Sequence, residues 1–537
     1  MSPSSQVARH GNDAPVPIPH LPVRKILFAS AHSIVDFSNG ASVATLDVLQ
    51  GLTAFGFDAQ AFCTPKLDLP HEACFEQIIR DLREPYQVRA SACGPHRAKV
   101  LYTRRRDVPI TVVRLDSTRH VRQRPEEVHA VLEFFRVFLD VLQPDVMLTY
   151  GGDPVSVGMI DVARRRGIPV VFAIHNLNYQ NAPPLDRVDY RIVASEFARR
   201  HYAETVGLEC HVLPNPVDWE RVRVGEPEEP LPEGNRLNPH PVCARSDTAL
   251  SCGTPLGYSG GVVSETQGAP AATLGSVMEP RWGTGTSDRY AGGVAQQSPG
   301  SPLAHPGDTR TPCPVPTLKA LHNGRHGAGQ ATRARRRFVT FVNPVPEKGV
   351  GPFVRIAQEL GRRRPDVRFL VVESRGTRQT LSACGLGRDD PVNVQLMPNT
   401  TDPRKFYALT RVALLPSLCP ENQPLVAVES MINGIPVIGS DRGGIPEVLG
   451  RSGFVLPLPE RLTPASPVVP EAEEVEAWVE TIVRLWDDRA LYERQSRLAR
   501  EEARRWHPDR LRPLYAAFFG NVRRRAGPAL VRSLSPG

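Results

Sequence analysis

Long hydrophobic runs and closely paired cysteines are both missing from this chain of 537 residues. No stretch approaches 18 consecutive apolar residues, so we expect no membrane-spanning helix. The nine cysteines are scattered, and no two stand in a C-x-x-C spacing, which favours reduced thiols. Residues 1–25 lack the apolar core of a secretory signal. These absences predict a soluble cytoplasmic protein.

Lysine is scarce as well, because only 6 of the 65 basic residues are lysine. The formal net charge of +8 is modest for a chain of this length. The excess of arginine reflects coding bias more than selection for a basic surface. Arginine triplets such as 104–106 and 523–525 are typical of solvated faces. We therefore expect no nucleic-acid partner.

Isoleucine and phenylalanine are absent from residues 225–330, which hold 17 glycines and 14 prolines among 106 residues. This level of glycine and proline without a period is typical of disorder. Such a segment cannot bury enough apolar surface to offset the entropy lost on ordering. We predict a disordered insertion over 225–335, with or without a partner motif.

Outside this segment, strand-like runs alternate with helix-like segments. Residues 24–30 and 336–344 have the mostly apolar centres of buried strands, whereas 125–143 and 351–363 have the period of amphipathic helices. Alternation of this kind indicates parallel sheets covered by helices on both faces. We predict an α/β protein with two Rossmann-like doubly wound domains facing a cleft. The expected segments are a flexible tail (1–22), a first domain (23–224), the insertion (225–335), a second domain (336–510), and a C-terminal helix and tail (511–537).

Two glutamates, Glu421 and Glu429, stand eight positions apart in the mostly apolar stretch "PENQPLVAVE" (420–429). Residues 402–412 are expected to form a helix and 413–417 a short strand. Pro424 suits the first position of the next helix, which puts Glu421 in the loop before it. Ligands of open α/β sheets bind beyond the carboxyl ends of strands, and helix N-termini suit phosphate. Because carboxylates bind hydroxyls strongly, the loop suits a sugar nucleotide.

The stretch "PSLCPENQPLVAVESMINGIPVIGSDRGGIPEVLG" (416–450) resembles the donor-binding signature of retaining glycosyltransferases of family 4, which have the two-domain GT-B fold. The resemblance extends, in chain order, over "SNGASVATLDVLQGL" (38–52, weakly), "PVVFAIHN" (169–176), "VASEFARRHYAETVGLECHVLPNPVD" (193–218) and "NPVPEKG" (343–349). It implies an acceptor-side first domain, a donor-binding second domain, and transfer of a sugar from a nucleotide sugar to an acceptor hydroxyl with retained anomeric configuration.

The resemblance also implies roles for single residues. Glu429, the second acid of an E-x7-E pattern, would hold the donor ribose, and Glu421, the first, would face the transferred sugar. Lys348 would neutralise the leaving diphosphate, and His175 would reach the donor sugar from the first domain. The other residues expected to bind the donor are Asn343, Asn422, Gln423, Pro424, Leu425, Asn39 and Gly40.

The chain departs from the family pattern at three places. Asn343 and Val342 stand where an arginine preceded by a glycine is common, so diphosphate neutralisation would depend more on Lys348 and the helix end. The first loop has Gly40–Ala41 in place of two glycines, and "NQP" (422–424) replaces a phenylalanine and glycine. These changes leave the donor open and allow a weakened enzyme.

Two other functions remain open. The chain could be a degenerate module that binds a sugar nucleotide without turnover, or a nucleotide-sugar epimerase on the same fold. No metal or cofactor is expected. The acceptor could be a glycan, a lipid-linked sugar or a small molecule. The mixture of aromatics and arginines at 509–533 allows weak peripheral contact with the inner face of the membrane, although packing on the first domain is the simpler role.

Overall fold

The computed structural model describes residues 24–68, 75–114, 124–177, 179, 183–225, 336–387, 394–465 and 468–522. All of them belong to one compact unit of the chain. The predicted N-terminal tail and the predicted insertion from residue 226 onward lie outside the described residues, as do residues 523–537.

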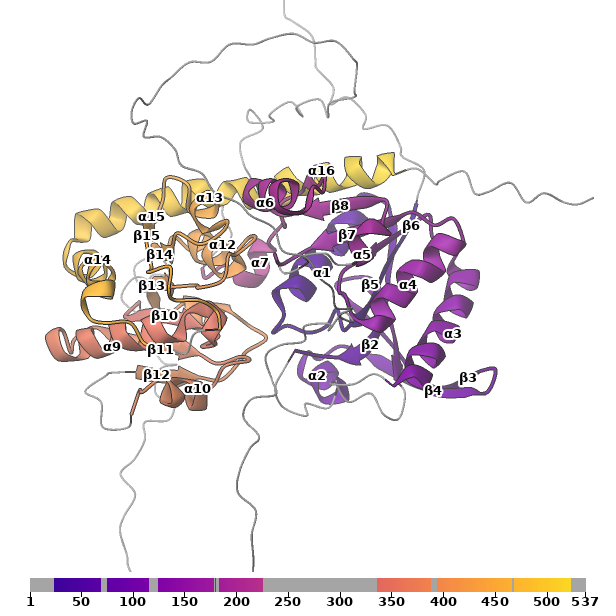
Figure 1. The fold of residues 1–537 in the computed structure, drawn as a ribbon, viewed down its shortest axis with the longest axis horizontal. Coiled ribbons are helices and arrows are strands. Elements are labelled where there is room, and N and C mark those ends of the chain that lie inside the picture. Colours follow the sequence, from indigo (N-terminus) through magenta and orange to yellow (C-terminus); the bar gives the residue numbers. More distant parts are fainter. Residues whose placement is uncertain are drawn as a thin grey trace, which may run out of the picture. The chain divides into compact units, whose positions relative to one another are not determined.

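The first domain is built on a sheet with the strand order β3-β4-β5-β2-β1-β6-β7-β8-β9 (Figure 1). All pairings are parallel except β3 with β4 and β4 with β5. Its strands are β1 (Lys25–His32), β2 (Asp58–Lys66), β3 (Tyr86–Cys93), β4 (His96–Arg105), β5 (Val108–Arg114), β6 (Val146–Thr149), β7 (Val170–Ile174), β8 (Tyr190–Val193) and β9 (His211–Val212). Its helices are α1 (Gly40–Ala54), α2 (Phe75–Asp81), α3 (Pro125–Leu142), α4 (Pro154–Arg165), α5 (Pro183–Asp186) and α6 (Glu196–Val206).

Alternate residues of β1 feed two separate apolar cores. Ile26 and Phe28 pack with α1 and α2 on one face, whereas Leu27 and Ala29 pack with α3, α4 and α6 on the other. All four side chains are fully buried. A strand buried on both faces is continuously apolar, which explains why this strand was readable from the sequence.

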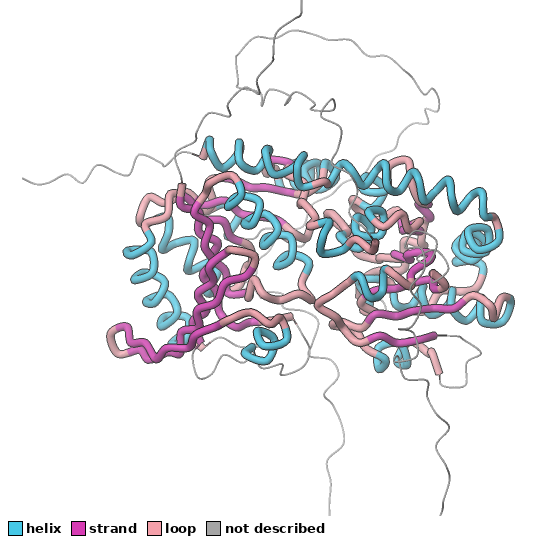
Figure 2. The backbone as a smooth tube through the Cα atoms, turned by 180° about the vertical axis from the view of Figure 1, so that it is seen from behind, coloured by secondary structure: helices cyan, strands magenta, loops and turns pink. Residues whose placement is uncertain are grey.

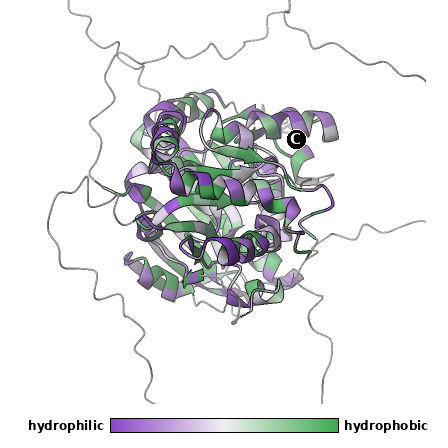
Figure 3. Cartoon of the chain, turned by 90° about the vertical axis from the view of Figure 1, so that its left-hand side faces the viewer, coloured by the Kyte–Doolittle hydropathy of each residue, from purple (hydrophilic) through white to green (hydrophobic). Residues whose placement is uncertain are grey.

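The second domain has an all-parallel sheet with the order β12-β11-β10-β13-β14-β15. Its strands are β10 (Phe338–Val342), β11 (Arg368–Val372), β12 (Val394–Met397), β13 (Thr410–Leu415), β14 (Val437–Ser440) and β15 (Phe454–Leu456). Its helices are the 3-10 turn η3 (Pro346–Lys348), α9 (Val350–Arg363), α10 (Arg378–Ala383), α11 (Arg404–Tyr407), α12 (Leu425–Ile432), α13 (Ile445–Leu449), the 3-10 turn η4 (Glu473–Val475), α14 (Glu476–Asp487) and α15 (Arg489–Ala503). Figure 2 shows the strands of the molecule in magenta and the helices in cyan. Strands of both domains are mostly green in the hydropathy colouring of Figure 3, whereas the helices alternate purple and green.

Each domain packs against a short segment that lies next to the other domain in the sequence. Helix α7 (Trp219–Val222) precedes the insertion, yet Val217 and Val222 pack in the core of the second domain. After α15, the turn η5 (Arg504–Trp506) leads to α16 (Pro508–Asn521), which places Tyr515 and Phe519 in the core of the first domain. The residues expected to close the first domain thus pack on the second, and the expected boundary at residue 510 falls inside α16.

Two stretches differ from the sequence expectation. Residues 86–105, for which no element was predicted, form the antiparallel hairpin β3–β4. The helix predicted over 402–412 is wrong in length, because α11 ends at Tyr407 and β13 already begins at Thr410. Strand β13 lies between β10 and β14, and this pairing on both edges favours a strand over a longer helix.

Candidate active site

A cavity of about 570 Å³ lies where strands of both sheets end. Its wall includes His175, Asn343 and Glu373, which directly follow β7, β10 and β11, and residues 420–424 of the loop after β13. In the second sheet β11 and β12 lie on one side of β10, and β13, β14 and β15 lie on the other. The order in which the chain adds strands therefore reverses at β10. Such a switch point is the ligand-binding crevice of open α/β sheets.

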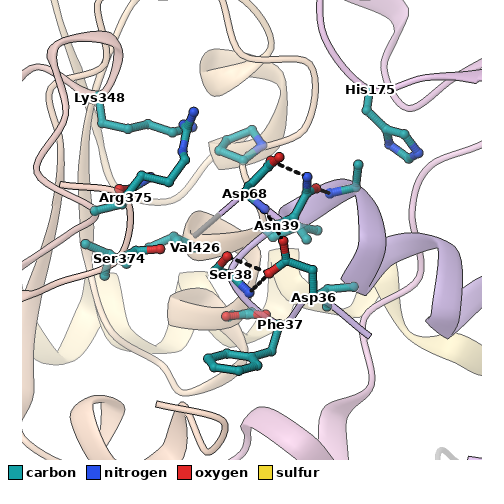
Figure 4. Close-up of a pocket in the computed structure, with 18 of the residues that line it drawn as sticks. Asp36, Phe37, Ser38, Asn39, Asp68, His175, Lys348, Ser374, Arg375 and Val426 are labelled. Carbon is teal, nitrogen blue, oxygen red and sulfur yellow. Dashed lines mark hydrogen bonds between the residues drawn. The ribbon is translucent and has the colours of Figure 1, made fainter. Parts of the chain in front are cut away.

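All the residues singled out from the sequence line this cavity. From the second domain they are Asn343, Lys348, Glu421, Asn422, Gln423, Pro424, Leu425 and Glu429, and from the first domain Asn39, Gly40 and His175. Figure 4 shows Lys348 on one side of the pocket and Asn39 and His175 on the other. Residues predicted from distant parts of the sequence therefore converge on one hollow.

Two glycine turns brace the loop that carries Glu421. Gly349 has a φ of +82°, and a Cβ there would lie 1.7 Å from the carbonyl oxygen of Pro416. On the other side a Cβ on Gly443 would lie 2.4 Å from the backbone nitrogen of Glu421, and the Gly444 amide donates to the Glu421 carbonyl at 2.6 Å. Only glycine permits backbones to approach this closely. The turns therefore fix where Lys348 and Glu421 emerge.

Lys348 and Glu421 form an ion pair in the cavity wall. The Lys348 Nζ lies 2.5 Å from Glu421 Oε1, and the Ser417 hydroxyl donates to the same oxygen at 2.8 Å. Burial lowers the pKa of Lys348, but the adjacent Glu421 carboxylate outweighs this effect, so that its pKa is raised overall. The lysine is thus held fully charged beside an acceptor-rich carboxylate.

Glu429 sits in α12 with both carboxylate oxygens engaged. Arg221 of α7 donates to Oε1 at 2.7 Å, and the Tyr407 hydroxyl donates to Oε2 at 2.7 Å. Burial and the Glu429 carboxylate both raise the pKa of Tyr407. The carboxylate is therefore fixed in place by two donors, and each oxygen keeps a lone pair for a further hydroxyl.

Helix α12 begins one residue later than expected. Pro424 is the N-cap, with φ −69° and ψ 103°, and Leu425 is the first helical residue. No side chain caps this helix. Its first amides lack an intrahelical partner, as at any helix start, and Leu425 itself lines the cavity.

Asn422 and Gln423 use their side chains to bind the first domain. The Asn422 amide accepts from the Ser195 hydroxyl at 2.8 Å and donates to the Ile174 carbonyl at 2.7 Å. Gln423 accepts from the Asn215 amide and donates to the Asn215 carbonyl. Their side chains are consequently committed to contacts between the domains, which leaves only their backbone amides for a ligand.

His175 directly follows β7 and is held by packing. Its Nε2 lies 3.4 Å from the Thr45 hydroxyl, and its ring packs edge-on against Tyr150, with the centroids 5.2 Å apart. Burial lowers the pKa of His175 to about 4. The imidazole is therefore neutral at physiological pH and can act as a hydrogen-bond partner without adding charge.

Asn39 and Gly40 start α1 at the cavity. The Asn39 side chain caps the helix by accepting from the Ala41 and Ser42 amides, and it donates to Asp68. A Cβ on Gly40 would lie 3.8 Å from Leu425 Cδ1. The first loop thus approaches the start of α12, and the Asn39 side chain is already occupied.

Asn343 has a structural task that the sequence did not suggest. It follows β10 with a φ of +62°, and its Oδ1 accepts from the Gly376 amide at 3.1 Å. The neighbouring Arg375 also lines the cavity, and it was not predicted because it lies outside the five short stretches that resemble the family motifs. Arg221 and Tyr407 were missed for the same reason, since nothing in their local sequence points to Glu429.

Glu447 caps a helix of the other domain. Its carboxylate accepts from the backbone amides of Glu196 and Phe197 at the start of α6. Glu447 does not line the cavity, so its observed role is structural.

Neither a metal cluster nor a membrane span is found in the described part of the chain. No group of three or more His, Cys, Asp or Glu residues there is arranged to hold a metal ion. None of the described helices is long and apolar enough to cross a bilayer. In α16 the apolar residues Tyr515 and Phe519 are buried in the first domain.

Residues 336–488 match the family described as Glycosyl transferases group 1. This range runs from β10 to the start of α15 and contains the part of the cavity wall that the second domain supplies. A MMP alpha-(1->4)-mannosyltransferase of Mycolicibacterium hassiacum is 34% identical over 125 residues. The aligned part spans 22% of this chain and 30% of that relative.

Two solved structures share the two-domain fold of the described residues. HepE of Anabaena, in complex with UDP and glucose, is 14% identical with a TM-score of 0.52, covering 93% of this chain and 100% of that one. The catalytic domain of starch synthase IV from Arabidopsis thaliana, bound to ADP and acarbose, is 10% identical with a TM-score of 0.54, covering 92% and 99%. The fold is thus GT-B, with two α/β domains.

Proposed function

We propose that this protein is a glycosyltransferase that moves a hexosyl group from a nucleotide sugar to an acceptor hydroxyl with retention of anomeric configuration. The observation that carries the proposal is the Lys348–Glu421 pair, 2.5 Å apart, in a cavity that also holds Glu429. The group 1 family match over the second domain supports the same reading.

The wall of the second domain suits the charges of the reaction. When the bond from the anomeric carbon to the diphosphate oxygen breaks, its electron pair leaves with the phosphate and positive charge develops on the sugar. Lys348 is placed to stabilise the departing phosphate, and Glu421 faces the sugar. A preorganised donor of this kind is worth about 3–4 kcal/mol of transition-state stabilisation.

Retention is consistent with attack from the face on which the diphosphate leaves. In that case the acceptor oxygen bonds to the anomeric carbon and its proton passes to the departing phosphate oxygen. His175 is half-buried and neutral at the opposite wall, so it contributes a hydrogen bond to the sugar without opposing the positive charge that develops there.

The donor is proposed to carry a nucleoside diphosphate and a hexose. One relative is described as a mannosyltransferase, and one solved neighbour was crystallised with UDP and glucose. Glu429 would accept from the ribose hydroxyls, because its carboxylate is held rigidly by Arg221 and Tyr407. The absence of a metal or cofactor requirement remains part of this proposal, as does the cytoplasmic location.

The test is turnover of UDP-, GDP- and ADP-hexoses by the full chain with a panel of glycan, lipid-linked and small-molecule acceptors. We expect one donor to be consumed, and the anomeric proton of the product to show by NMR the configuration of that donor. Glu421→Gln and Lys348→Ala should each lower kcat at least about 100-fold, which is the usual effect of removing one group that stabilises charge in the transition state.

Lys405→Ala is a matched control, since Lys405 lies in α11 and does not line the cavity. It should retain full turnover. Tight binding of a diphosphate without donor consumption by the wild-type protein would instead identify a binding module. Conversion of the donor without any acceptor would identify an epimerase.

A further inference from the structure

Arg375 is a positively charged residue of the cavity wall that no sequence motif singled out. It follows β11, is exposed, and lines the cavity together with Lys348. Its guanidinium makes no hydrogen bond or ion pair with any described residue. Figure 4 shows the ends of the Arg375 and Lys348 side chains close together on the same side of the pocket.

The turn that carries Arg375 is built against the loop after β10. The Asn343 Oδ1 accepts from the Gly376 amide at 3.1 Å, and the Asn343 amide donates to the Val372 carbonyl at 2.8 Å. A Cβ on Gly376 would lie 2.0 Å from the Pro344 carbonyl oxygen, so a larger residue could not follow Arg375 without moving the turn. Two loops are thereby locked together, and Arg375 is held at the cavity rather than on a free loop.

The charges around Arg375 are unevenly compensated. Lys348 is paired with Glu421, whereas the nearby Glu373 carboxylate accepts from the backbone amide of Arg378. Glu347 also lines this part of the cavity. Arg375 lies close enough to Lys348 to oppose its positive charge. Two cations that face each other in a partly enclosed site are stabilised by an anion between them.

We infer that Arg375 binds the diphosphate of the donor together with Lys348, and that Asn343 positions Arg375 by holding its turn. The inference rests on the proposed glycosyl transfer. A guanidinium presents a planar fork of donors that matches phosphate oxygens, whereas Lys348 contributes a point charge. The arrangement gives the diphosphate a second cation even though Asn343 itself has no charge.

The test is calorimetric titration of the full chain with UDP, GDP and ADP and with the matching monophosphates. The variants are then titrated with the diphosphate that the wild type binds most tightly and with its monophosphate. Arg375→Ala should weaken diphosphate binding by about 10- to 100-fold, the range expected for a lost hydrogen bond to a charged group. The affinity of Arg375→Ala for the monophosphate should equal that of the wild type. Arg375→Lys should recover part of the lost diphosphate affinity. Asn343→Ala should weaken diphosphate binding less than Arg375→Ala does.

Arg378→Ala is the matched control, because Arg378 is also exposed, lies three residues away and does not line the cavity. It should bind the diphosphate as the wild type does. If Arg375→Ala binds the diphosphate normally, or if Arg378→Ala is weakened equally, the inference is wrong while the proposed function stands. If the wild-type protein binds no diphosphate, both fail. Chemical denaturation of each variant confirms that it is folded.

Discussion

The side-chain amide of Gln423 exchanges two hydrogen bonds with the backbone of Asn215, which lies 208 residues earlier in the chain. Asn215 donates to Gln423 Oε1 at 2.8 Å, and Gln423 Nε2 donates to the Asn215 carbonyl at 3.0 Å. Both residues are buried. The Gln423 side chain thus satisfies both backbone hydrogen-bonding groups of Asn215.

Truncation of Gln423 should destabilise the protein measurably. Gln423→Ala leaves the buried Asn215 amide and carbonyl without partners, which should lower the free energy of unfolding by about 1–3 kcal/mol. Urea denaturation measures the change. Gln395→Ala, at an exposed position of β12, should change it by less than about 0.5 kcal/mol. Equal effects of the two variants would show that the exchange of hydrogen bonds contributes nothing.

The low pKa of His175 should make stability depend on acid. The unfolded chain protonates this histidine below pH about 6.5, whereas the folded protein does so only near pH 4, so unfolding takes up a proton between these values. The free energy of unfolding should therefore decrease as the pH is lowered from about 6.5 to about 4, by about 1.4 kcal/mol per pH unit from this group. His175→Asn should flatten the slope, as measured by denaturation at several pH values.

His129 on α3 supplies the comparison for this titration, because its side chain is 61% exposed. His129→Gln should leave the slope between pH 6.5 and 4 as it is in the wild type. An NMR titration that placed the His175 pKa near 6.5 would contradict the expectation directly.

The Arg221–Glu429 ion pair should be costly to break from one side. Arg221→Met leaves the buried Glu429 carboxylate with Tyr407 as its remaining donor, and such an uncompensated charge costs about 3–5 kcal/mol. The double variant with Glu429→Gln should recover part of this loss, which a double-mutant cycle measures. Arg489→Met removes the exposed ion pair with Glu493 and should cost less than about 1 kcal/mol.

Gly349 offers a test of close backbone approach. Gly349 and Gly385 have nearly the same φ, +82° and +87°, but only at Gly349 would a Cβ meet a neighbouring backbone atom. Gly385→Ala should cost about 1–2 kcal/mol for its left-handed conformation alone. Gly349→Ala should cost at least about 4 kcal/mol, since the Pro416 carbonyl must also move. Similar melting temperatures for the two variants would contradict this reading of the site.

The sequence allowed the α/β fold class to be predicted, because buried parallel strands are apolar on both faces, whereas the GT-B architecture was implied by the family resemblance of residues 416–450. Strand β13 and the stretch that follows it carried both the strand signal and the motif. The hairpin β3–β4 carried no such signal. Its residues are largely exposed, and the turn into β5 uses Arg106 and Asp107 with positive φ instead of the usual glycine.

The site was predictable only where its residues belong to short stretches that resemble a family motif. Glu421 and Glu429 belong to one motif, so their spacing pointed to a shared ligand. Arg221 and Arg375 reach the same cavity from α7 and from the turn after β11. Their partners depend on how distant segments pack, which no local pattern contains. Asn343 looked like a lost arginine, whereas the structure shows it holding the turn of Arg375.

The exchange of α7 and α16 means that the two halves of the polypeptide are interlocked. A protease cut after Gly225 would separate the chain covalently, yet the amino-terminal piece would still end in Val217 and Val222 packed into its neighbour. The carboxy-terminal piece would likewise keep Tyr515 and Phe519 inside the other half. A nicked protein should therefore travel as a single particle through a sizing column, and neither half should be soluble when produced by itself.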